Sequence, residues 1–159
     1  MKKEELEELM ISNLEYAKTL LARDGKLSPV AFLVYRDNID IIGLSFRDDN
    51  EKIIQIKMLR KLVKEKDADA IFMITESWHV CTNKDEDLDI KPSENPMRKE
   101  CIFIVGECEN TRISMMQTFE RENDKIVFGE RIDMDGSETT RLNFGLKDKK
   151  YDINKISLN

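Results

Sequence analysis

The sequence of 159 residues predicts one α+β domain that spans residues 1–159. Two stretches in its first half carry apolar residues at helical spacing, and a β-hairpin pattern lies between them. Beyond residue 98 the pattern is almost purely β, with polar turns between apolar runs. We therefore expect an N-terminal helix, a β-hairpin, a second helix packed on a mixed sheet, and then a largely antiparallel β meander.

The first predicted helix runs from Lys3 to Arg23 and is stopped by Gly25 and Pro29. Its apolar residues recur at spacings of three and four, and they are Leu6, Leu9, Met10, Leu14, Ala17, Leu20 and Leu21. After it, Val30–Tyr35 and Ile39–Phe46 are rich in β-branched and aromatic residues, with a short polar connection between them. These two runs are expected to pair as an antiparallel hairpin.

The second predicted helix begins after Asp48, which stands three residues before Glu51 as in a capping pair, and it continues to about Lys66. Its expected apolar face consists of Ile54, Met58, Leu59, Leu62 and Val63. The expected solvent face carries Lys57, Arg60, Lys61 and Lys64. A helix in this position permits a parallel crossover between the hairpin and the next strand.

The run Ala70–Cys81 is the most apolar in the chain and is predicted to be a strand in the middle of the sheet. The acidic segment Thr82–Met97, which contains two prolines, predicts a long exposed loop. Four strands are expected after it, at Cys101–Cys108, Ile113–Glu120, Lys125–Ile132 and Thr140–Leu146. The tail Lys147–Asn159 is expected to be a short edge strand or frayed.

Composition narrows the function classes. A net charge of -6 and a pI near 5.0 disfavour a dedicated nucleic-acid binder, because its phosphate ligand would be repelled. No run approaches the ~20 apolar residues of a membrane span. The N-terminus lacks the apolar run of a signal peptide, and three cysteines without a scaffold-like spacing suggest reduced thiols. We therefore expect a cytoplasmic protein with no nucleic acid and no membrane among its partners.

Glu76 is the clearest anomaly in the predicted central strand. Alternation places its carboxylate on one face with Phe72, Ile74 and Trp78, where a charge needs a cation or a donor. A carboxyl group in such surroundings suits general acid or base catalysis, whereas the simpler interpretation is a structural salt bridge. We favour the structural role for Glu76, and for Trp78 a core or interface ring over a stacking platform.

His79 is the one histidine and falls on the opposite face from Glu76, which makes a catalytic pair of the two awkward. With Cys81, Cys101 and Cys108 it nominally supplies four zinc ligands. However, the last two cysteines are seven positions apart on one predicted strand, whereas zinc ligands usually come in pairs from a tight turn. We expect no metal and no cofactor.

The acidic loop also bears on calcium binding. Residues near the offsets of an EF-hand loop are Asn83, Asp85, Asp87, Asp89 and Glu94. The sixth position, where the sharp turn needs glycine, is Leu88, and strands rather than helices flank the loop. A solvated charge run is therefore favoured over a calcium site. The sequence contains none of the glycine-rich phosphate loops, the nucleophile elbow or the zinc-protease motif.

A longer pattern lies between residues 70 and 108. The apolar strand ends in Glu76-Ser77-Trp78, the loop contains Pro92-Ser93-Glu94-Asn95-Pro96-Met97-Arg98, and Glu100-Cys101-Ile102-Phe103 opens the next strand. This pattern resembles one shared by small uncharacterised bacterial, archaeal and phage proteins. The resemblance implies a common fold core and names no reaction.

The same pattern suggests a candidate pocket. The two prolines stiffen the loop, so Arg98 would be delivered beside the central strands as the partner of Glu76. With Glu100 nearby and Trp78 as a roof, the guanidinium could take an anionic ligand. The candidate pocket residues are thus Glu76, Trp78, His79, Arg98 and Glu100, and a structural role for the ion pair is favoured over ligand binding.

Two functional hypotheses follow. The first is a non-enzymatic cytoplasmic protein that binds a protein partner or itself, for instance as a homodimer, through edge strands or the adaptable side chains of Met115 and Met116. The alternative is a small hydrolase or ligand-binding enzyme with a polar pocket around Glu76 and Arg98. The sequence leaves open whether the protein is an enzyme, and it identifies neither a substrate nor a partner.

Overall fold

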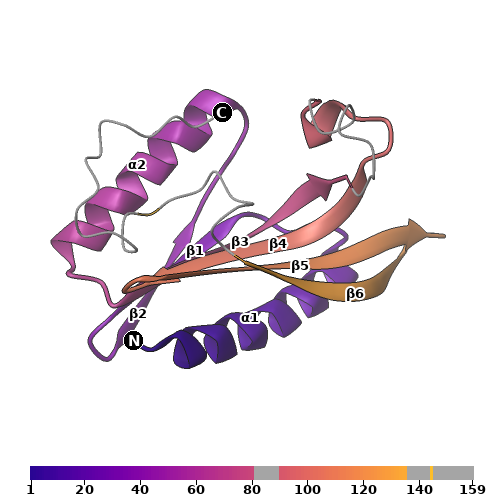
Figure 1. Ribbon diagram of the computed structural model, residues 1–159. Helices are drawn as coiled ribbons and strands as arrows, with labels where there is room; N and C mark the ends of the chain where they lie inside the picture. Colours follow the sequence, from indigo (N-terminus) through magenta and orange to yellow (C-terminus); the bar gives the residue numbers. More distant parts are fainter. Residues whose placement is uncertain (81–89, 136–143, 145–159) are drawn as a thin grey trace.

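The computed structural model describes residues 1–80, 90–135 and 144, and it has an α+β fold in three layers (Figure 1). The elements in chain order are α1 (Lys3–Asp24), β1 (Val30–Tyr35), β2 (Asn38–Gly43), α2 (Asp49–Glu65), β3 (Ala70–His79), the short 3₁₀ turn η2 (Pro92–Glu94), β4 (Lys99–Cys108), β5 (Thr111–Glu122) and β6 (Lys125–Asp135). The strands form one sheet in the order β2-β1-β3-β4-β5-β6. One face of the sheet packs against α1 and the other against α2.

Helix α1 follows the predicted periodicity closely. Its buried residues are Leu6, Met10, Leu14, Ala17 and Leu21. Gly25 ends the helix in the left-handed conformation, with φ 74°, and donates its N–H to the Leu21 carbonyl at 2.8 Å. The helix approaches β4 at Gly106, where a Cβ atom would lie 2.6 Å from the Met10 sulfur. The absence of a side chain at Gly106 therefore allows this close contact.

Helix α2 confirms the predicted capping residue but not the predicted faces. Asp48 accepts a hydrogen bond from the Glu51 N–H at 2.7 Å. The buried residues are Ile56, Leu59, Arg60 and Val63. Ile54, expected in the core, is 65% exposed, and Arg60, expected in solvent, is 6% exposed. Ile56 rather than Ile54 completes the apolar stripe, and Arg60 lies on the buried side of α2, near the charge of Glu107.

The sheet is antiparallel at every strand pair that the structure describes, so the expected mixed sheet is wrong. The β1–β2 hairpin is confirmed, with a two-residue turn in which Arg36 has φ 51°. The chain then leaves β2 at the end of the sheet where β1 begins, and α2 carries it back along the sheet. Consequently β3 starts where β1 ends and runs opposite to it. The helix reverses the chain once more instead of providing a parallel crossover.

The second half of the described chain is the expected meander. The turn at Asn110 (φ 59°) joins β4 to β5, and the turn at Asn123 and Asp124 (φ 48° and 63°) joins β5 to β6. The predicted strand Thr140–Leu146, apart from Phe144, and the tail after it lie outside the described residues, as do positions 81–89. No helix among the residues that the structure describes is long and apolar enough to cross a membrane.

Candidate functional site

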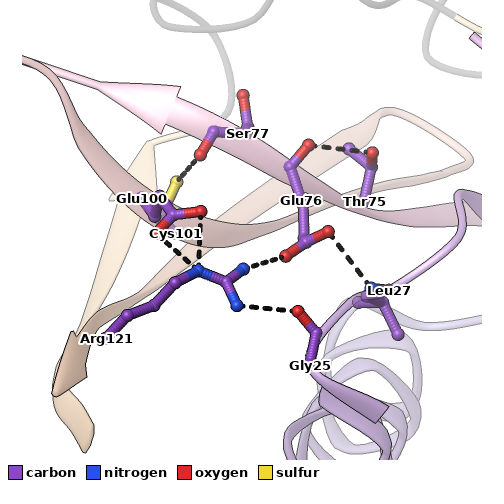
Figure 2. Close-up of polar contacts among 8 residues, drawn as sticks. All are labelled: Gly25, Leu27, Thr75, Glu76, Ser77, Glu100, Cys101 and Arg121. Carbon is purple, nitrogen blue, oxygen red and sulfur yellow. Dashed lines mark hydrogen bonds and ion pairs between the residues drawn. The ribbon is translucent and has the colours of Figure 1, made fainter. Parts of the chain in front are cut away.

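The carboxylate of Glu76 lies on the α1 face of the sheet, near the end of β3 (Figure 2). Its Oε1 is 3.1 Å from Nη2 of Arg121, and its Oε2 accepts the Leu27 N–H at 3.1 Å. The side chain is 28% exposed, so the carboxylate is partly solvated rather than fully buried. The predicted need for a cation is confirmed, and the backbone donor is an addition that the sequence did not reveal.

Arg121, from β5, is the centre of this polar network (Figure 2). Its Nε lies 2.9 Å from Oε2 of Glu100, and its Nη1 donates to the Gly25 carbonyl at 2.7 Å. The hydrogen bond to Glu100 is the main reason that the pKa of Arg121 is raised, and the charges of both carboxylates add to it. One guanidinium therefore ties β3, β4 and β5 to the C-terminal cap of α1.

Arg98 does not have the predicted place beside Glu76. Its guanidinium carbon lies 4.8 Å from the centroid of the Trp78 ring, in a cation–π arrangement. Trp78 is 40% exposed and Arg98 is exposed, so this pair lies at the surface. Arg121 takes the role that was assigned to Arg98 because β5 carries it to the same sheet face as Glu76.

The five predicted pocket residues thus separate into three parts. Glu76 and Glu100 meet through Arg121, and Trp78 pairs with Arg98. His79 lies on the opposite face, and its pKa is lowered mainly by burial and further by the charge of Lys99, its cross-strand neighbour. The structure does not bring these side chains around one common centre.

A second polar cluster, which was not predicted, lies on the α2 face. Glu107 on β4 is fully buried, and its Oε1 receives hydrogen bonds from Arg112 Nη2 at 2.6 Å and from the Phe144 N–H at 3.0 Å. Burial lowers the pKa of Arg60, and the nearby Glu107 opposes that effect. The available signal was the polar pair Glu109-Asn110 after the predicted strand Cys101–Cys108, because a two-residue turn there places Glu107 directly opposite Arg112.

A groove of about 510 Å³ lies between α1 and the β1–β2 hairpin. Apolar residues that line it are Tyr16, Ala17 and Leu20 on α1 and Phe32, Ile41 and Ile74 on the sheet. Two of them project strongly into solvent, since Tyr16 is 63% exposed and Ile41 is 69% exposed. Polar or charged groups at the α1 end of the groove are Arg23, Asp24 and Lys26. The sequence does not reveal this groove, because the groove depends on how α1 crosses the sheet.

The chain matches the family described as bacteriophage lambda protein ea47, over residues 1–144. It belongs to the Ea47 family. No curated protein and no solved structure was found to match it.

The Ea47 match agrees with the resemblance to small uncharacterised phage proteins, and it covers a much larger part of the chain. The family description names no activity, so any function must be argued from the site. Among the described residues, no group of three or more histidine, cysteine, aspartate or glutamate side chains is placed to hold a metal ion.

Proposed function

We propose that this Ea47-family chain is a non-enzymatic cytoplasmic protein that acts by binding a protein, either a partner or a second copy of itself. The observation that carries this proposal is the apolar groove beside β2. It lies next to the edge strand of the described sheet, where backbone groups are available for pairing. A groove and an edge together suit an extended protein segment.

Exposed apolar side chains on β2, one of which lines this groove, support the proposal. Ile39 is 49% exposed and Ile41 is 69% exposed, and both belong to β2. Clustered apolar groups of this kind, unlike isolated ones, typically mark an interaction surface. The contact residues expected from sequence were different, because Met115 and Met116 are 0% and 8% exposed and belong to the sheet interior.

The alternative of a hydrolase around Glu76 and Arg98 receives less support from the geometry. Both carboxylate oxygens of Glu76 already have partners within the fold. The cation expected to bind an anionic substrate, Arg98, stacks on Trp78 instead. An ion network of this kind stabilises the connection after α1 without requiring a ligand.

The test compares the wild-type chain with an Ile41→Lys variant. Self-association is measured by sedimentation. Partner binding is measured by immobilising the wild-type and the variant chain separately and comparing the amount of protein that each one retains. We expect self-association, a retained protein, or both, and a loss of at least tenfold in the variant. If neither form of binding depends on Ile41, the proposed function is wrong.

A further inference from the structure

We propose that the occupant of this surface is a second copy of the chain, paired through β2 about a two-fold axis that lies midway between the two copies of Ile41. The two sheets would then form one continuous antiparallel sheet across the interface. This inference rests on the proposed function and specifies its partner. Four observations on β2 support it. They are the direction of its outward backbone groups, the register that two copies can adopt, the open space beside the strand, and the low number of charged residues on it.

The direction of the backbone groups follows from one hydrogen bond. The Leu44 N–H donates to the Pro29 carbonyl at 2.9 Å, so position 44 faces β1. Backbone groups alternate in direction along an antiparallel strand, so Asp40 and Ile42 also face β1. The N–H and C=O groups of Ile39, Ile41 and Gly43 therefore point away from the sheet. These three residues present six backbone groups to a new strand.

Two-fold symmetry restricts how two copies of β2 can pair. Directly opposite residues in an antiparallel pair share a face, whereas consecutive residues of one strand do not. The axis must therefore lie between two copies of the same residue. An axis at Asp40 places two carboxylates opposite each other, which is unfavourable. An axis at Ile41 places Ile41 opposite its own copy and Ile39 opposite Gly43, with all six outward backbone groups paired. The Ile41 register is therefore favoured.

The space beside β2 fits the same register. Ile39 and Ile41 lie opposite Val34 and Phe32, on the α1 face of the sheet. A Cβ atom at Gly43 would meet nothing within 4 Å, so the space over that glycine is open. The second copy's Ile39 would occupy this space, and the two grooves would meet at the axis. The exposed side chains of Ile39 and Ile41 in both copies would thereby be covered.

Charge also distinguishes β2 from the other edge of the described sheet. The single ionisable residue of β2 is Asp40, which accepts a hydrogen bond from the Tyr35 hydroxyl at 3.0 Å and lies 3.9 Å from Lys66 Nζ. In contrast, β6 carries several charged residues, among them Lys125, Glu130, Arg131 and Asp133, and its pairing with β5 has a register shift. Charges and irregularities of this type prevent edge-to-edge pairing. Of the two edge strands of the described sheet, only β2 has the features of an edge that pairs with itself.

The first experiment is sedimentation equilibrium on the full chain over a wide concentration range. Wild type is expected to form a dimer, and Ile41→Lys, which places two ammonium groups opposite each other, is expected to be monomeric. Ile54→Lys is the matched control, because Ile54 is similarly exposed at 65% but lies on α2. Each copy carries a net charge of -6, so the dimer is expected to strengthen as salt screens the repulsion.

The second experiment tests the register by disulfide cross-linking in a Cys81→Ser background, with copper–phenanthroline as the oxidant. Ile41→Cys is expected to form a covalent dimer, because paired residues of this type have Cα atoms about 5.5 Å apart. Ile39→Cys is the control. Its two copies would be four residues apart in register, about 13 Å, and are expected not to cross-link.

Each other outcome overturns the inference in a distinct way. A wild-type chain that stays monomeric excludes the dimer, while Ile41-dependent capture of another protein would leave the proposed function intact. A dimer that survives Ile41→Lys uses a different surface. Cross-linking at Ile39→Cys instead of Ile41→Cys shows a different register. Circular dichroism of every variant checks that it is folded.

Discussion

The two faces of the sheet hold carboxylate–guanidinium pairs of the same chemistry in different surroundings. On the α2 face, Glu107 and Arg112 have side chains that are 0% and 8% exposed. On the α1 face, Glu76 and Arg121 have side chains that are 28% and 40% exposed. The first pair lies in the protein interior, and the second is partly exposed beside the C-terminal end of α1.

This difference sets the expected energetic role of each pair. A buried ion pair costs desolvation, and breaking it leaves an uncompensated charge in a medium that solvates it poorly. A partly exposed pair is screened by water, so each contact contributes little to stability. The main role of the cluster around Arg121 is therefore to hold the chain segment after α1 in place against three strands. The following predictions test this contrast.

The largest effect is expected for Glu107→Gln. The amide removes the negative charge and leaves the buried Arg112, with Arg60 nearby, uncompensated. We expect a loss of about 3 kcal/mol in the free energy of unfolding, measured by urea denaturation. Glu109→Gln is the control, since Glu109 is exposed beside the turn, and a change within about 0.5 kcal/mol is expected there. Equal effects of the two substitutions would contradict the buried role of Glu107.

A smaller effect is expected for Arg121→Met. The substitution keeps an apolar stem but removes the contacts to Glu76, Glu100 and the Gly25 carbonyl. Because these groups are partly exposed, we expect a loss of about 1 kcal/mol in unfolding free energy. Hydrogen exchange at the Leu27 amide, which donates to Glu76, is expected to become faster.

Arg131→Met is the control for that prediction, because Arg131 pairs only with the exposed Asp133 two residues away among its described ion-pair partners. It is expected to leave exchange at Leu27 unchanged. The same exchange rate in the Arg121 variant as in wild type would show that the network does not hold the segment after α1.

Glu76→Gln is expected to have a still smaller effect. The amide oxygen can continue to accept the Leu27 N–H, so only the charge interaction with Arg121 is lost. We expect a loss of roughly 0.5 kcal/mol, and less when Arg121→Met is already present, as measured by a double-mutant cycle. A gain in stability would instead favour a carboxylate retained for chemistry at the expense of stability.

The smallest effect concerns the pH dependence of stability through His79. Burial lowers the pKa of His79 below its usual 6.5. As pH falls below that value, the unfolded chain gains a proton that the folded chain does not, so stability declines and the decline is complete below the folded pKa. His79→Gln is expected to show a shallower loss between about pH 7 and pH 5 in chemical denaturation. A slope identical to wild type would rule out this contribution.

Much of the fold could be predicted from local patterns. The periodicity of α1, the cap at Asp48 and the polar turns of the meander depend on neighbouring residues, and all three predictions are confirmed. The strand order and the direction of β3 depend on where α2 takes the chain, which no local pattern encodes. For the same reason the predicted face of α2 was wrong at Ile54 and Arg60, because the contacts of α2 with the sheet decide which of its residues are buried.

The candidate site was less predictable. The anomaly at Glu76 could be recognised because a carboxylate among apolar residues requires a partner. Its partner could not, because Arg121 reaches it across β4, and this needs the relative register of three strands. The resemblance directed attention to Arg98, which is closer in sequence but belongs to the surface pair with Trp78. The choice between Arg98 and Arg121 as the partner of Glu76 therefore depended on how strands far apart in the sequence are aligned.

The two-residue turns at Asn110 and at Asn123 and Asp124 have a consequence for the order of folding. Hairpins with such turns close short loops, so β4, β5 and β6 can pair within a small part of the chain. The pairing of β1 with β3 must instead wait until the intervening α2 segment is in place. We expect pulse-labelled hydrogen exchange during refolding to protect the meander before β1. The edge strand β2 would then join the sheet late in folding, after most of the other strands have paired.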